Sequence, residues 1–124
     1  MKLGGRRMKT ILVADDDPDV RESVKTILEK QDYRVITATG GDDCLKILQE
    51  ETPDLILLDI RMPGIPVKNV VEQIEDIKIA FMSIVWISEA RKQGLCEQDN
   101  VVDFIQKPFD ANDLIKRVSL ILNE

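Results

Sequence analysis

The sequence contains no histidine, only two cysteines and few aromatic residues (4%). The lack of histidine excludes a histidine general base, a Ser-His or Cys-His catalytic pair and a histidine-ligated metal. Cys44 lies at an apolar position of a helical pattern and Cys96 in an unrelated context, so a small buried thiol is favoured over a disulfide. There is no signal-peptide pattern and no apolar run of membrane-spanning length. We therefore expect a cytoplasmic protein that does not bind a membrane.

Basic residues are outnumbered, 17 against 23 acidic residues, which gives a formal net charge of -6. This balance argues against direct nucleic-acid binding. The length of 124 residues and the hydrophobic content of 44% fit one globular domain. Residues 1–7, "MKLGGRR", precede a second methionine, and we interpret them as a leader or an alternative start. The folded domain is then expected over residues 8–124.

Strand and helix patterns alternate five times along the chain with short connections. Apolar runs of strand type occupy residues 10–14, 34–39, 54–59, 80–88 and 101–106. Helical spacing of apolar residues follows each run, at 18–30, 42–50, 67–75, 89–98 and 111–123. This order predicts an α/β fold, with a doubly wound five-stranded parallel sheet and five helices on its two faces.

Charged and polar residues stand where these expected strands end. Asp15 and Asp16 follow the first strand, Asp59 ends the third, Ser88 ends the fourth and Lys107 follows the fifth. Ligands of doubly wound sheets bind at the carboxyl ends of the strands. If the first and third strands are neighbours, the carboxylates converge there, and Mg2+ is a natural partner for them. With a lysine and a hydroxyl to hold phosphoryl oxygens, Asp59 could act as a nucleophile and become an aspartyl phosphate.

Each of these residues also has a purely structural interpretation. Asp17 before Pro18 is mainly a helix N-cap, and an isolated Asp15-Asp16 pair would be turn residues. A lone Ser88 would more often cap a helix, a lone Lys107 would be a solvated charge, and "MPG" after Asp59 could be only a turn. The joint placement at strand ends favours the chemical interpretation.

Three segments together resemble the receiver domain of two-component response regulators, over about Lys9 to Asn123. They are "ILVADDDPDVR", "PDLILLDIRMPG" and "DFIQKPF", in that order. The resemblance implies a flavodoxin-like sheet of strand order 2-1-3-4-5. It also implies phosphorylation of Asp59 by a sensor histidine kinase or a phosphotransfer protein. Asp15, Asp16, Asp59 and the carbonyl of Arg61 would hold the Mg2+.

The same resemblance gives roles to residues later in the chain. Ser88 would bond a phosphoryl oxygen, and Lys107 would form an ion pair with it. The Lys107–Pro108 peptide is expected to be cis. Phe104 matches an aromatic switch position that turns inward when the hydroxyl is drawn toward the phosphoryl group, although a strand residue there would also pack in the core.

The sequence departs from the family pattern at three places. "MPG" is followed by "IPVKNVV", where Pro66 suits a helix start. The stretch from Ser88 to Lys107 is short, and Asn100-Val101 replaces the usual Gly-Ala, so a short or distorted fourth helix is expected. Glu89 follows the expected hydroxyl position where a small residue is usual. We predict that this carboxylate alters phosphorylation or dephosphorylation rates.

These features lead to three hypotheses of decreasing weight. The first is a phosphorylatable switch that phosphorylates and dephosphorylates itself without turnover of an external substrate. The second is a pseudo-receiver, an interaction module that is not phosphorylated. The third is an Asp-nucleophile phosphohydrolase, although Arg61 stands where such enzymes carry a second acid. The downstream protein is unknown, and homodimer formation through the fourth helix, fifth strand and fifth helix stays open.

Overall fold

The computed structural model describes residues 8–123, so the expected leader at residues 1–7 lies outside the described part. The strands are β1 (Thr10–Ala14), β2 (Arg34–Ala38), β3 (Leu55–Asp59), β4 (Lys78–Ser83) and β5 (Val101–Gln106). The helices are α1 (Pro18–Glu29), α2 (Gly41–Leu48), α3 (Val67–Glu72), α4 (Ile87–Lys92) and α5 (Ala111–Leu122). Within the described residues, no helix is long and apolar enough to cross a membrane.

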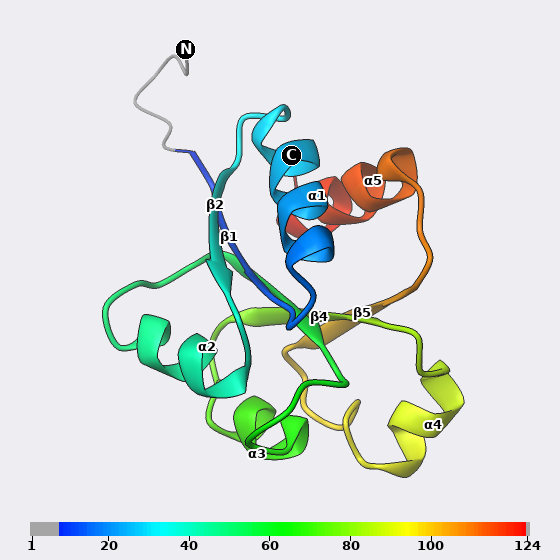
Figure 1. The fold of residues 1–124 in the computed structure, drawn as a ribbon. Coiled ribbons are helices and arrows are strands. Elements are labelled where there is room, and N and C mark those ends of the chain that lie inside the picture. The colour runs from blue at the N-terminus through cyan, green and yellow to red at the C-terminus, as the bar shows by residue number, and fades with distance from the viewer. Residues whose placement is uncertain (1–7, 124) are drawn as a thin grey trace.

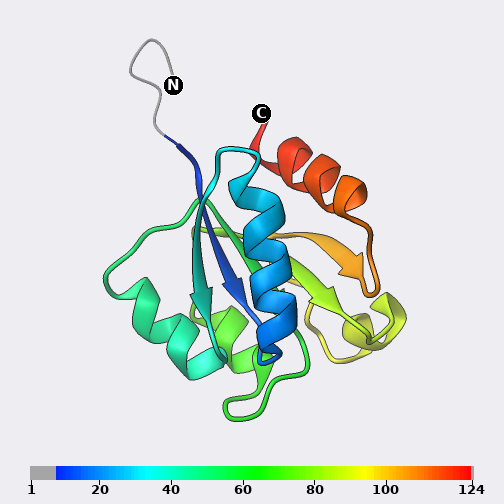
Figure 2. The same ribbon diagram turned by 45° about the horizontal axis from the view of Figure 1, so that its top comes forward.

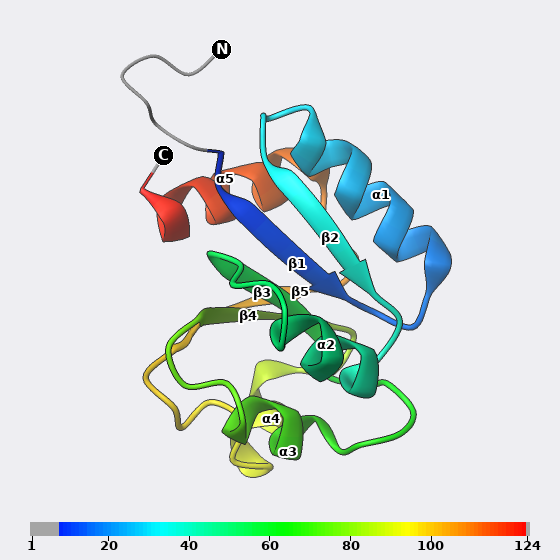
Figure 3. The same cartoon turned by 90° about the vertical axis from the view of Figure 1, so that its left-hand side faces the viewer.

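The five strands form one parallel sheet in the order β2-β1-β3-β4-β5. Helices α1 and α5 cover one face, and α2, α3 and α4 cover the other (Figures 1 and 3). Because all strands are parallel, their carboxyl ends share one edge of the sheet, near the start of α1 and beside α4 (Figure 2). The predicted doubly wound architecture and strand order are confirmed.

The central strands are buried on both faces, which explains why their sequences are continuously apolar. Side chains of β1 alternate between two core clusters. Ile11 and Val13 pack with α1 and α5, whereas Leu12 and Ala14 pack on the opposite face. As expected, Asp17 is the N-cap of α1, and its side chain accepts a hydrogen bond from the backbone N–H of Asp19.

The predicted fourth strand, residues 80–88, is wrong at both ends. β4 begins at Lys78 and ends at Ser83, and Ser88 is an exposed residue of α4. The chain leaves the sheet at Ser83 because the hydroxyl Oγ of Ser83 accepts a hydrogen bond from the backbone N–H of Val85 (3.0 Å), which closes a local turn. The apolar letters that continue the run are exposed, with Ile84 at 60% and Trp86 at 70%.

The short fourth helix is confirmed, because α4 has only six residues. Polar side chains hold the connection that follows it. Asn100 Nδ2 donates to the carbonyls of Ile74 and Ile77, and Gln98 Nε2 donates to those of Val71 and Ile74. These bonds tie the α4–β5 connection to the end of α3, at the place where the family usually has Gly-Ala.

Candidate functional site

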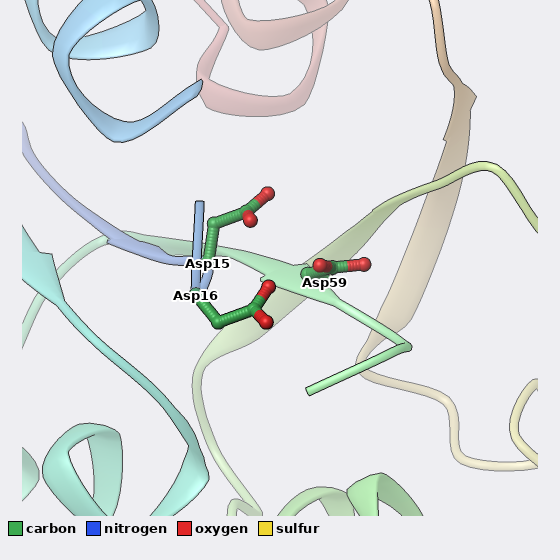
Figure 4. A group of neighbouring side chains, drawn as sticks. All are labelled: Asp15, Asp16 and Asp59. Atoms are coloured by element: carbon green, nitrogen blue, oxygen red, sulfur yellow. The ribbon is translucent and has the colours of Figure 1, made fainter. Parts of the chain in front are cut away.

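Three carboxylates meet at the carboxyl edge of the sheet. Asp15 and Asp16 follow β1 directly, and Asp59 is the last residue of β3. Strands β1 and β3 pair with Ala14 opposite Leu58, so the residues after these two lie side by side. One oxygen from each carboxylate lies within 4.8 Å of the others (Figure 4). Asp15 and Asp59 are buried and Asp16 is exposed, so the cluster opens to solvent on the side of Asp16.

Lys107 reaches this cluster from the loop after β5. Its Nζ lies 2.7 Å from Asp15 Oδ2 and 3.7 Å from Asp59 Oδ2. The lysine side chain is 15% exposed, so its ion pairs with the two carboxylates are largely buried away from water. The interpretation of Lys107 as a solvated charge is therefore wrong. The expected cis peptide between Lys107 and Pro108 is present.

Each buried carboxylate is held by the loop that follows its own strand. Asp15 Oδ1 accepts from the backbone N–H of Asp17 (3.0 Å), and Asp59 Oδ1 accepts from that of Arg61 (3.2 Å). The other oxygen of each, Oδ2, faces Lys107. Arg21, which sequence reasoning did not single out, donates to the carbonyl of Asp15 at 2.7 Å. These contacts fix the orientation of the two carboxylates.

The electrostatic balance of the site is negative. The pKa of Asp59 is raised from 3.8 to about 6, chiefly by burial and next by the neighbouring charge of Asp15. Lys107 and the Arg61 N–H act in the opposite direction without cancelling the rise. A site of carboxylate oxygens with uncompensated negative charge fits a hard divalent cation such as Mg2+.

The hydroxyl at this edge belongs to Ser83, not to Ser88. Ser83 is fully buried and follows Met82, which pairs with Asp59 across the β3–β4 ladder. Its carbonyl accepts from the backbone N–H of Lys107 (2.9 Å). The sequence does hold a signal for Ser83, which is the first polar residue after the apolar run "IAFM". Since Ser88 is not at the strand end, Glu89 does not follow the hydroxyl residue there either; Ile84 does.

Phe104 lies in the middle of β5 and is half-buried. Its ring centroid is 6.4 Å from that of Phe81. Phe104 also lines a cavity of about 360 Å³ together with Ile87, Arg91 and Cys96. The residue therefore packs against the core, as one interpretation expected, and it borders space under α4.

The described geometry can be compared with known proteins. The family model of the response regulator receiver domain matches residues 11–119. The chain belongs to this family. Its motifs, fold and clustered carboxylates agree with that assignment.

Two relatives are transcriptional regulators. AfsQ1 of Streptomyces coelicolor is 42% identical over 122 residues, which cover 93% of this chain and 52% of that protein. The alkaline phosphatase synthesis regulator PhoP of Bacillus subtilis is 32% identical over 116 residues, covering 92% and 48%. This receiver domain therefore spans about half the length of these relatives.

A solved receiver protein has the same fold. The response regulator TrrA of Thermotoga maritima, in complex with Mg2+ and BeF, superposes with a TM-score of 0.82 at 33% identity. The match covers 93% of this chain and all (100%) of the other.

Proposed function

We propose that this receiver domain is a phosphoacceptor switch. A sensor histidine kinase or a phosphotransfer protein would transfer a phosphoryl group to Asp59, with Mg2+ bound, and no external substrate would be turned over. The observation that carries the proposal is the cluster of Asp59 with Asp15 and Asp16, with Lys107 beside the two buried carboxylates. The Mg2+–BeF complex of TrrA, a relative at 33% identity, supports it.

In the proposed reaction, a carboxylate oxygen of Asp59 attacks phosphorus and forms a P–O bond. The P–N bond of a phosphohistidine donor breaks, and its electron pair stays on the histidine nitrogen. Asp15, Asp16, Asp59 and the Arg61 carbonyl would hold the Mg2+, which would offset the charge of the carboxylates and of the transferred group. Lys107 would form an ion pair with a phosphoryl oxygen. Because the lysine side chain is largely buried, water would weaken that attraction little.

We assign the hydroxyl contact to Ser83, in place of Ser88. Ser83 stands at the same sheet edge as Asp59, while Ser88 is exposed on α4. In the described conformation its Oγ accepts from the Val85 N–H, and its own O–H would donate to a phosphoryl oxygen once the hydroxyl is drawn inward. The effect of Glu89 on the rates stays a prediction, now for a residue of α4.

The output would be a change of the α4 and β5 surface. Drawing the Ser83 hydroxyl inward would let Phe104 turn inward, away from the cavity beside α4 that it lines in this structure. A downstream protein, or a second copy in a homodimer, would read this surface, and we propose no direct nucleic-acid binding by this domain. We also propose a cytoplasmic location, which the two free cysteines fit.

A pseudo-receiver is the second candidate, and the six-residue α4 is the observation that favours it. The complete carboxylate and lysine set weighs against it, because an unused cluster of buried like charges would only destabilise the fold. A phosphohydrolase has less support, since Arg61 takes the place of a second acid.

The decisive experiment is intact mass spectrometry after incubation with acetyl phosphate and Mg2+, with the Asp59→Asn variant as control. We expect one phosphoryl adduct on the wild type, none on the variant and none without Mg2+. If no adduct accumulates, titration with beryllofluoride and Mg2+, followed by Trp86 fluorescence, tests for a short-lived phosphoryl form. A lack of response in both assays would establish the pseudo-receiver instead.

A further inference from the structure

Gln106, the last residue of β5, connects that strand to the loop after β4. Its side-chain Nε2 donates to the carbonyl of Ser83 (3.2 Å) and to the carbonyl of Ile84 (3.1 Å). A primary amide nitrogen carries two hydrogens, so both are engaged with consecutive carbonyls. The next residue, Lys107, reaches the carboxylates. Gln106 and Lys107 therefore connect the end of β5 to the loop that begins at Ser83 and to the buried carboxylates.

The bond to Ile84 is the distinctive one. The carbonyl of Ser83 also accepts from the Lys107 backbone N–H within the sheet, so its position does not depend on Gln106. The carbonyl of Ile84 lies beyond the strand. By holding that peptide, Gln106 fixes the path of the chain into Val85, whose N–H donates to Ser83 Oγ (3.0 Å).

Apolar packing contributes little to holding this loop. Ile84 is 60% exposed and Trp86 is 70% exposed, and only Val85 packs partly against the core. The loop conformation thus depends largely on the Gln106 bonds and on the Ser83–Val85 bond. A few hydrogen bonds of this kind can be exchanged for others at small cost.

We propose that Gln106 is a positioning residue that restrains the switch, an inference that rests on the proposed function. It favours the loop conformation in which Ser83 Oγ accepts from Val85. In this proposal, the hydroxyl turns toward a phosphoryl group on Asp59 as the local turn rearranges and the Ile84 carbonyl moves away from Gln106. The amide of Gln106 therefore opposes the phosphorylated conformation and sets how readily it forms.

The test is the Gln106→Met variant, which keeps the length of the side chain and removes both donors. Beryllofluoride with Mg2+ is titrated and Trp86 fluorescence is followed. We expect about fivefold tighter binding than for the wild type. The variant loses about one net hydrogen bond that stabilises the loop conformation without beryllofluoride, and a loss of that size corresponds to this change in affinity. Gln93→Met is the matched control, since Gln93 is exposed on α4's C-terminal side and bonds only within its helix segment. It should leave the affinity unchanged.

Two further measurements separate positioning from a general loss of structure. In a Ser83→Ala background, Gln106→Met should no longer change the affinity, because the hydroxyl that it restrains is gone. Without ligand, amide exchange at Val85 should be about fivefold faster in Gln106→Met and unchanged in Gln93→Met.

The outcomes distinguish this inference from the proposed function. If the wild type binds beryllofluoride and Gln106→Met binds equally or more weakly, the restraint by Gln106 is wrong while the switch stands. If the wild type neither binds beryllofluoride nor forms an adduct, the proposed function fails, and the inference fails with it.

Discussion

The two sides of the site are held in different ways. On the β1–β3 side, Asp15 and Asp59 are buried, and each has one oxygen fixed by its own loop and the other facing Lys107. On the β4–α4 side, exposed Ile84 and Trp86 follow Ser83, and side-chain hydrogen bonds hold the loop. Buried charges must be held firmly because an unpaired one is costly, whereas exposed polar contacts can be exchanged with water.

This difference suggests a division of tasks between the two sides. The β1–β3 side is suited to chemistry, since hydrogen bonds and ion pairs hold the orientation of its buried carboxylates. The β4–α4 side is suited to signalling, since a loop held by a few exchangeable hydrogen bonds can change conformation at small cost. Three predictions test this contrast, in order of decreasing effect.

Removing the lysine should produce the largest loss of stability. Lys107→Met leaves Asp15 and Asp59 as unpaired, buried like charges, so we expect the free energy of unfolding to fall by about 3 kcal/mol at pH 7 in EDTA. Urea denaturation measures the change. Lys92→Met, an exposed change on α4, should stay within about 0.5 kcal/mol. Equal losses in the two variants would show that the charged side is not specially constrained.

Removing one carboxylate should instead stabilise the protein at neutral pH. The folded-state pKa of Asp59 is raised from 3.8 to about 6, so the folded state favours the neutral carboxyl. The stability due to this group is complete below the usual pKa and is lost as the pH rises through about 6. Asp59→Asn should therefore gain about 2 kcal/mol at neutral pH in EDTA, and almost nothing near pH 4.

Paired urea denaturation curves at the two pH values check this sign. A gain of equal size at both would mean that charge burial at Asp59 is not its cause. The Asp110→Asn variant, which keeps an N-cap acceptor at the exposed start of α5, is a suitable control. At neutral pH, this exposed substitution should not reproduce the gain expected for Asp59→Asn.

Removing the hydroxyl on the β4–α4 side should change the stability less than the two substitutions above. Ser83→Ala removes the acceptor of the Val85 N–H, which should lower the free energy of unfolding by about 1 kcal/mol. The same variant should weaken beryllofluoride binding about tenfold, the value of one good hydrogen bond. Ser88→Ala should change neither quantity. If Ser88→Ala were the variant that weakens binding, the assignment of the hydroxyl to Ser83 would be wrong.

Most of the fold was accessible from the pattern of apolar residues. The central strands are buried on both faces and are apolar throughout, and α1 begins at an Asp-Pro pair that caps it. The end of β4 was not accessible in this way. The sequence after Ser83 is typical of a continued strand because "IVWI" is apolar, yet the structure exposes Ile84 and Trp86.

The site shows the same division. Asp15, Asp16, Asp59 and Lys107 could be found from the sequence because each stands at or close to the end of a strand pattern. Ser83 was missed in favour of Ser88, since nothing local says where the strand stops pairing. Arg21 and Gln106 were missed because their partners are backbone carbonyls, which carry no sequence signature.

The sequence by itself determined the family, the alternation of strands and helices and the residues that bring charge to the sheet edge. These follow from local hydrophobic periodicity and from short motifs. Only the tertiary structure decided which serine ends β4 at the sheet edge, how high the pKa of Asp59 is raised and which side chain holds the loop after β4. Those properties depend on distances between residues far apart in the chain, and the packing of β1, β3, β4 and β5 sets these distances.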